Sequence, residues 1–342
     1  MKKMQPISVK SKKIDKRSVL ATLGKFQSFF GLVAIFLIAS IICVRNGKNL
    51  FLGADNLSNL IRAISENGIM AIGMTFVILL GGIDLSVGAM LGLSAALSAS
   101  LMITNGLSFL PMILLVLGLS ALFGLFNGII HTKLGVQAFI VTLASMNMAR
   151  GLARIISGGK SIPIGYQPTG PADPVHSILA SRIFATEGFL GIPVPAICFV
   201  FLAILFSMLF KYTRLGRHVY AIGGNETSAF LCGIKVDRVK ILMFTLCGVM
   251  AGVAGIIHSA QTRLGGPNDG MGYELNAIAA VAIGGTSMAG GKGTIAGTVV
   301  GALILGILDN MLGLNNVDVN LQLIVKGLII IGAVVMQKER KK

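Results

Sequence analysis

Charge is scarce in this chain of 342 residues, because Asp, Glu, Lys and Arg make up 12% of it, whereas a soluble domain carries about 25%. Apolar residues make up 54%, so too few polar side chains remain to cover a water-exposed surface. A membrane interior requires every backbone polar group to be paired within the protein, which continuous apolar helices achieve. The composition therefore excludes a soluble enzyme and predicts an all-α, polytopic integral membrane protein.

Acidic residues are the scarcer charge, since 13 Asp and Glu stand against 29 Lys and Arg and leave a net charge of +16. A nucleic-acid-binding face needs a continuous basic patch on a folded domain. The basic residues instead separate the apolar runs and crowd both ends of the chain. We therefore expect no nucleic-acid partner and interpret these residues as determinants of membrane orientation.

Residues for catalysis and metal binding are also few. The four histidines and four cysteines are scattered without ligand-like spacing. The stretch Gly290–Gly293 resembles part of a phosphate-binding loop, but Thr286 replaces the upstream glycine and Gly293 replaces the hydroxyl residue that follows the lysine. We expect no catalytic residue, no metal site and no cofactor, and any energy from ATP must come from a partner subunit.

Ten apolar runs are candidate membrane spans, for which a helix needs about 20 residues. The runs cover residues 26–44, 60–80, 85–104, 108–130, 136–156, 192–210, 239–260, 274–288, 294–313 and 319–336. We predict about ten transmembrane helices in a single domain, 26–336, between a basic segment at 1–25 and a basic tail at 337–342. Glycine-rich stretches at 81–88 and 284–297 predict broken helices, which occur near transport pathways.

The basic residues also predict the orientation. With a cytoplasmic N-terminus, the internal segments contain 20 of the 29 Lys and Arg. These segments are 1–25, 131–135, 211–240, 286–293 and 337–342. Cytoplasmic loops carry such an excess, so we predict a multi-pass protein of the cytoplasmic membrane with both termini inside. Residues 157–191, which hold four prolines, would form an external loop, and the basic residues 211–240 a cytoplasmic one.

The cytoplasmic loop contains the pattern of a short helix with defined ends. Ile222–Asn225 is typical of a turn, Asn225 can cap a helix over Glu226–Cys232, and Gly233 can end it in the left-handed conformation. A short helix at this face could bind another protein. A solvated loop between two membrane helices is the alternative, and the spacing does not decide between them.

Asp84 is the strongest functional candidate among the ionisable residues inside apolar runs, because burying a charge in lipid is costly. It follows a Gly-Gly pair, where it either caps the next helix or lines a transport pathway. Glu274, Asp309 and Lys326 lie near the ends of runs, where snorkelling to the interface explains them.

Several ordered motifs, from about residue 50 to the end of the chain, resemble those of permease subunits of ribose-type ATP-binding-cassette (ABC) monosaccharide importers, in the branched-chain amino acid/ribose-type permease family. The matching stretches are residues 71–75, 82–88, 136–143, 213–217, 221–226, 272–275, 284–287 and 289–294. The form of the motif around Asp84 suggests ribose as the substrate, and carriers of xylose, galactose, allose, inositol and quorum signals look similar.

The resemblance implies a transport subunit that makes and breaks no bonds and is therefore no enzyme. It implies two permease copies, as a homodimer or with a paralogue, among the lipids of the bacterial cytoplasmic (inner) membrane. An ABC ATPase subunit would bind the cytoplasmic face, and an extracytoplasmic sugar-binding protein would deliver the monosaccharide. The lack of Trp and the four Tyr fit a low-affinity conduit. An ion-coupled secondary sugar transporter is the first alternative, and a membrane scaffold is the second.

Two sets of candidate residues accompany this interpretation. The predicted substrate pathway consists of Asp84, Ser86, Asn127, Asn147 and Glu274. The predicted ATPase-coupling set consists of Gly223, Gly224, Asn225, Glu226 and Gly233. For each pathway residue the alternative stays open that it only hydrogen-bonds to a neighbouring helix, as polar side chains in membranes commonly do.

Overall fold

In the computed structural model the described residues are 27–45, 47–164 and 192–337. The predicted basic segment at 1–25, most of the predicted external loop and residues 338–342 of the tail lie outside this part of the chain. The predictions made for them therefore stay untested.

The described residues form twelve helices and two pairs of very short strands. The helices are α2 (Gln27–Ile42), α3 (Ala54–Leu79), α4 (Val87–Ile103), α5 (Phe109–Lys133), α6 (Ala138–Ser157), α8 (Val194–Tyr212), α9 (Arg214–Gly224), α10 (Glu226–Leu231), α11 (Val236–Thr262), α12 (Tyr273–Ile283), α13 (Ile295–Leu314) and α14 (Val319–Gln337). The antiparallel strand pairs are β1 (Val44–Arg45) with β2 (Lys48–Asn49), and β3 (Ile162–Pro163) with β4 (Leu264–Gly265).

Six of these helices (α3, α5, α6, α8, α11 and α13) are long and apolar enough to cross a membrane. Four further apolar helices, α2, α4, α12 and α14, correspond to the remaining predicted runs. The chain is therefore an all-α polytopic membrane protein, as predicted. The number of ten spans stays a prediction.

The glycine-rich interruptions set the ends of the short helices. α3 ends at Leu79, Gly81 follows with φ +81°, and α4 begins only at Val87. The run at 274–288 was predicted too long, because α12 ends at Ile283, just before Gly284 and Gly285, and Gly285 has φ +88°. A left-handed glycine ends a helix at little steric cost.

α3 and α11 form the centre of the protein, and most of their side chains are buried. Glycine allows their backbones to approach closely, since Gly73 of α3 lies against Cys247 and Met250 of α11. On its other side α11 packs against α5, where Gly124 contacts the backbone at Phe244. Such contacts between small residues stabilise helix pairs in lipid, where water provides no hydrophobic driving force.

The outer faces of the helices remain apolar. Leu114 of α5, Ile155 of α6, Phe201 of α8 and Leu328 of α14 are each more than half exposed. Large apolar patches on a folded protein mark contact with another protein or with a membrane, and here they surround the helices on several sides.

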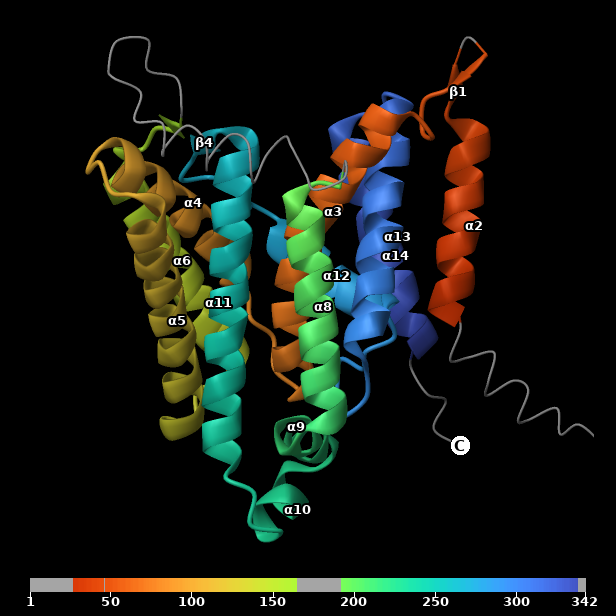
Figure 1. Ribbon diagram of the computed structural model, residues 1–342. Helices are drawn as coiled ribbons and strands as arrows, with labels where there is room; N and C mark the ends of the chain where they lie inside the picture. The colour runs from red at the N-terminus through yellow and green to blue at the C-terminus, as the bar shows by residue number, and fades with distance from the viewer. Residues whose placement is uncertain (1–26, 46, 165–191, 338–342) are drawn as a thin grey trace, which may run out of the picture.

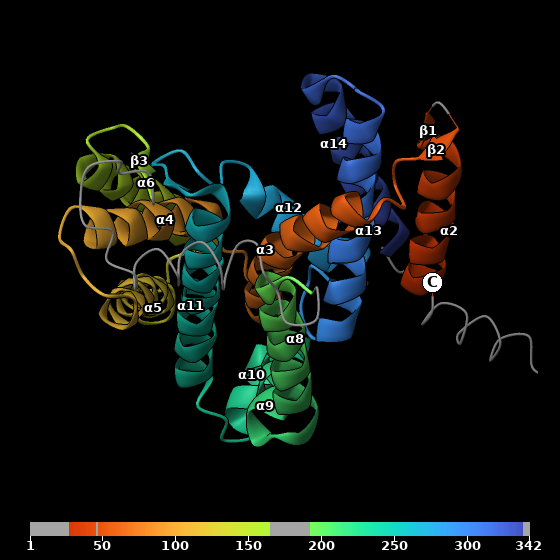
Figure 2. The ribbon, with the colours of Figure 1, turned by 45° about the horizontal axis from the view of Figure 1, so that its top comes forward.

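The helices form three groups, which Figures 1 and 2 both show. α4, α5 and α6 lie on one side, α2, α13 and α14 on the other, and α3, α8, α11 and α12 between them. α9 and α10 lie together at one end of the bundle, and β1 and β4 lie at the opposite end (Figure 1).

Three segments that were predicted to be internal lie at the α9–α10 end. Lys133 at the end of α5 pairs with Asp237 at the start of α11, with 2.8 Å between Nζ and Oδ2. The Tyr220 hydroxyl of α9 donates to the carbonyl oxygen of Gly293, 2.8 Å away. The arrangement therefore agrees with the common side that the basic residues predict for residues 131–135, 211–240 and 286–293.

Candidate transport pathway and coupling surface

The break between α3 and α4 is organised by the buried carboxylate of Asp84, which is 1% exposed. One of its oxygens, Oδ1, accepts the backbone N–H of Ser86 at 2.9 Å and the hydroxyl of Ser86 at 2.5 Å. An Asp side chain that accepts from the backbone two residues later closes a turn and satisfies a free N–H at a helix start. Asp84 therefore fixes the entry into α4.

Side chains from α5 and α6 continue this hydrogen-bonded chain. Asn127 of α5 donates to the Ser86 hydroxyl at 3.2 Å, and its amide oxygen accepts the hydroxyl of Ser145 from α6. Thr142 of α6 accepts the N–H of Leu85 at 3.1 Å. The structure thus brings three predicted pathway residues together, Asp84, Ser86 and Asn127, in an interior where they bond to one another.

The other two predicted pathway residues lie elsewhere. Asn147 is exposed on α6 and donates to the carbonyl oxygen of Leu143 on its own helix at 3.1 Å. Glu274 lies in the first turn of α12, and its carboxylate occupies the space beside Gly88 in the first turn of α4. The five residues therefore do not form one continuous site.

A second group of charged residues, which the sequence analysis missed, lies near Glu274. His258 of α11 and Glu66 of α3 are both buried, with 3.0 Å between Nδ1 and the carboxylate. The other ring nitrogen of His258 is 3.6 Å from Asp269, and Arg150 of α6 donates to the backbone carbonyl of Pro267 at 3.0 Å. A signal was present, because Glu66 and His258 are ionisable residues within apolar helices, where such residues are costly.

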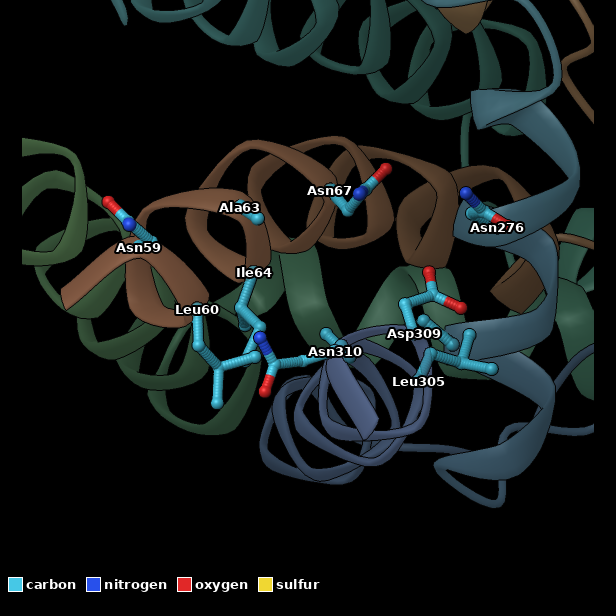
Figure 3. Close-up of a pocket in the computed structure, with 12 residues that line it drawn as sticks. Asn59, Leu60, Ala63, Ile64, Asn67, Asn276, Leu305, Asp309 and Asn310 are labelled. Carbon is cyan, nitrogen blue, oxygen red and sulfur yellow. The ribbon is translucent and has the colours of Figure 1, made fainter. Parts of the chain in front are cut away.

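A cavity of about 280 Å³ lies between α3, α12 and α13 (Figure 3). Amide side chains from these helices line it together with one carboxylate, Asp309. From the sequence, Asp309 was expected to reach the membrane interface by snorkelling, but its carboxylate instead pairs with Lys326 of α14 at 2.9 Å.

The short helix that was predicted in the loop 211–240, at the candidate ATPase-coupling surface, is present as α10. The Asn225 side chain accepts the N–H of Ser228 at 2.9 Å, which caps the helix at its first residue, Glu226. Gly233 follows the helix with φ +81°. Phe230 and Leu231 at its end are 68% and 78% exposed, which is the kind of apolar surface that marks a protein interface.

The charges around α10 leave a basic surface. Glu226 pairs with Lys240 at the start of α11, with both carboxylate oxygens 2.7 Å from Nζ. Arg214 and Arg217 of α9, and Arg238 of α11, are exposed. A surface of one sign attracts a partner of the opposite sign and orients its approach.

The predicted turn at Ile222–Asn225 was wrong in its first three residues, because α9 continues as a helix to Gly224. Gly223 is needed there for close packing. A Cβ at this position would overlap the carbonyl oxygen of Leu79, at the end of α3, and would lie 2.5 Å from the backbone nitrogen of Gly291. That same nitrogen donates to the Leu79 carbonyl at 2.9 Å.

α9 is therefore in backbone contact with both glycine-rich breaks. Gly223 touches the end of α3 and the loop between α12 and α13, and the Tyr220 hydroxyl bonds to the same loop. Burial raises the pKa of Tyr220 further above neutral pH, where a phenol is already a protonated donor. A displacement of α9 would move both breaks together.

Comparison with known proteins identifies the family. A family model for the permease component of branched-chain amino acid transport systems matches residues 56–334. The ribose import permease protein RbsC of Bacillus subtilis is 41% identical over 340 residues, which cover 99% of each chain. The xylose transport system permease protein XylH of Haemophilus influenzae is 35% identical, covering 92% of this chain and 97% of its own. The D-allose permease AlsC of Escherichia coli is 36% identical, over 92% and 93%.

No solved structure matches the chain significantly. The family match spans more than half of the sequence and the relatives align over nearly all of it. The chain therefore belongs to the family of permease components described for branched-chain amino acid transport systems.

Proposed function

We propose that this chain is the membrane-spanning permease subunit of an ABC importer that carries a monosaccharide, with ribose as the substrate. The observation that supports this most strongly is the 41% identity to ribose import permeases of Bacillus subtilis and Escherichia coli over at least 91% of the chain. Relatives named for xylose and allose define the class of substrate as small neutral sugars. The chain itself is the conduit and performs no hydrolysis.

Three kinds of partner belong to this proposal. A separate ABC ATPase subunit binds ATP and magnesium at the cytoplasmic face, and an extracytoplasmic binding protein delivers the sugar. A second permease copy, identical or paralogous, completes the pathway in the lipid of the inner membrane. We also propose that both termini are cytoplasmic, which the basic surface at the α9–α10 end supports.

The coupling surface is α9 and α10, with the set Gly223, Gly224, Asn225, Glu226 and Gly233. The caps at Asn225 and Gly233 make α10 a rigid element with exposed apolar residues at its tip. When the ATPase subunits close, they displace this element as a rigid body. The contact of Gly223 with Leu79 and Gly291 passes the displacement to the two helix breaks.

The break at Asp84 has a supporting role in this mechanism. The chain of hydrogen bonds through Ser86 and Asn127 keeps α4 joined to α5 while the end of α3 is displaced. Glu274 lies where α12 meets α4, beside Gly88, so that movement of α12 would also reach the start of α4. We also propose that Asn147 lines the pathway. Its amide donates a hydrogen bond within its own helix, apart from Asp84, Ser86 and Asn127.

A cell-based experiment tests the proposal. Bacteria that lack their own ribose permeases should gain uptake of labelled ribose when this chain is expressed with its ATPase subunit and sugar-binding protein. Omission of any one component should abolish uptake. Uptake that persists without the ATPase and collapses when the proton or sodium gradient is removed would instead support an ion-coupled transporter.

A further inference from the structure

The cavity between α3, α12 and α13 contains buried hydrogen-bond acceptors that the described residues leave unused. The side-chain oxygen Oδ1 of Asn67 and the Oδ1 oxygen of Asp309 are buried, and neither has a hydrogen-bond partner among residues 27–45, 47–164 and 192–337. An unsatisfied buried acceptor costs free energy of about 1–3 kcal/mol. Both residues line the same cavity, which points to a ligand, or to water that a ligand displaces.

The polar lining comes from three helices that meet at this place. Figure 3 shows Asn67 of α3, Asn276 of α12 and Asp309 of α13 gathered at one side of the cavity, with Asn59 at the other end. The fourth amide, Asn310, is already paired with Asn56, since their side chains exchange hydrogen bonds of 2.8 and 3.0 Å. Asn67, Asn276 and Asp309 are therefore the groups that a ligand would engage.

The chemistry of these groups selects the ligand. The two unused acceptors require a molecule that donates hydrogen bonds, and the amide N–H groups of Asn67 and Asn276 can donate in return. Lys326 neutralises Asp309, with 2.9 Å between Nζ and Oδ2, so a cationic ligand is not needed to balance the carboxylate. Within the described residues no cluster of His, Cys, Asp and Glu could hold a metal ion.

The remaining side chains that line the cavity are apolar and closely packed. Leu60, Ile64 and Leu305 line the cavity, and Gly306 lies so close to Ile64 that a larger residue there would displace that side chain. The volume of about 280 Å³ lies just below the usual range for pockets that hold small molecules. A compact neutral polyol fits, since it combines hydroxyl donors with C–H faces.

We propose that this cavity, through Asn67, Asn276 and Asp309, is the intermediate site at which a monosaccharide is held while it crosses the permease. The inference rests on the proposed function. The described lining contains no aromatic ring, so a sugar is held by hydrogen bonds alone and released readily. α12 and α13 flank the loop that α9 contacts, so displacement of α9 changes the shape of the site.

The test uses the complete complex in proteoliposomes, with the ATPase subunit and the sugar-loaded binding protein. Asn67→Leu and Asn276→Leu remove the polar groups with little change in volume. Each should lower the maximal rate of ribose uptake about tenfold, which is the effect of one lost hydrogen bond to the ligand. ATP hydrolysis stimulated by the loaded binding protein should continue, so that more ATP is consumed for each sugar transported. Asn315→Leu, at an exposed position of α13's end outside the cavity, is the matched control.

A second measurement does not depend on how well those variants fold. In a background without native cysteines, Ala63→Cys places a thiol in the cavity wall, and its modification by ethyl methanethiosulfonate should block uptake while stimulated ATP hydrolysis persists. Unchanged ATP-to-sugar ratios in both leucine variants and in the modified cysteine variant would overturn the inference. If the unmodified wild-type complex transports no ribose, the proposed function fails instead.

Discussion

Replacement of Gly223 by alanine is the sharpest perturbation of the proposed coupling route. A methyl group there would overlap the carbonyl oxygen of Leu79 and approach the backbone nitrogen of Gly291. Both neighbours are backbone atoms held by their own hydrogen bond at 2.9 Å, so α9 itself has to shift. Overpacking of this kind costs about 1–3 kcal/mol, which exceeds the gain of about 0.5–1 kcal/mol from replacing glycine by alanine within a helix.

The adjacent residue provides a matched control. A Cβ at Gly224 meets no atom within 4 Å, so Gly224→Ala adds the same methyl group and helix propensity without the overlap. Gly224 belongs to the coupling surface through its backbone, which lies against Gly291, and the added methyl group enters open space, so we expect Gly224→Ala to leave transport near the wild-type level. Gly223→Ala should lower the number of sugars transported per ATP hydrolysed, because the ATPase still binds but the displacement of α9 no longer reaches the ends of α3 and α12.

The assay is paired measurement of ribose uptake and ATP hydrolysis in the same proteoliposomes, with co-purification of the ATPase subunit as the check on assembly. If Gly223→Ala and Gly224→Ala behave alike in coupling ratio, the contact among α9, Leu79 and Gly291 does not transmit the motion, and the mechanism is wrong.

Three further predictions concern other parts of the account. Glu226→Lys replaces the ion pair with Lys240 by repulsion and should reduce ATPase co-purification several-fold, whereas Glu226→Gln should have a smaller effect. If both variants retain the ATPase as well as the wild type does, α10 is not the interface. Asp84→Ala leaves the N–H and hydroxyl of Ser86 without their buried partner and should lower the free energy of unfolding by about 1–3 kcal/mol, measured by thermal unfolding in detergent. Asp84→Asn retains the acceptor oxygen and should insert into the membrane normally, with reduced uptake. An unfolding temperature of Asp84→Ala equal to that of the wild type would refute the capping role. Cys232 is exposed between α10 and α11. A membrane-impermeant thiol reagent that reaches the periplasm should therefore label Cys232 in inside-out vesicles but not in intact cells. Labelling in intact cells would contradict the proposed orientation.

Most of the fold could be predicted from the sequence because its signals are local. A long apolar run specifies a membrane helix by length alone, and the runs at 108–130 and 294–313 match α5 and α13 closely. Asn225 and Gly233 specified the ends of α10 in the same way, since a cap depends on residues a few positions apart. The glycine pairs mark where α3 and α12 stop, although the run predicted at 274–288 continued across the second pair.

The parts that could not be predicted depend on which helices become neighbours. Gly223 suggested a turn, but its requirement is the space taken by Leu79, which lies 144 positions earlier in the chain. His258 and Glu66 were not recognised as a pair because nothing local connects α11 with α3. Asp309 was assigned to snorkelling, although its partner Lys326 lies on the next helix and the residue lines a cavity.

The most direct test of the central claim is ribose uptake by proteoliposomes that contain this permease, its ATPase subunit and externally added binding protein. Because the proposed importer is driven by ATP, uptake should require ATP and magnesium on the ATPase side and should be unaffected by ionophores that dissipate proton and sodium gradients. Uptake that proceeds without ATP, or that follows an imposed ion gradient, would contradict it.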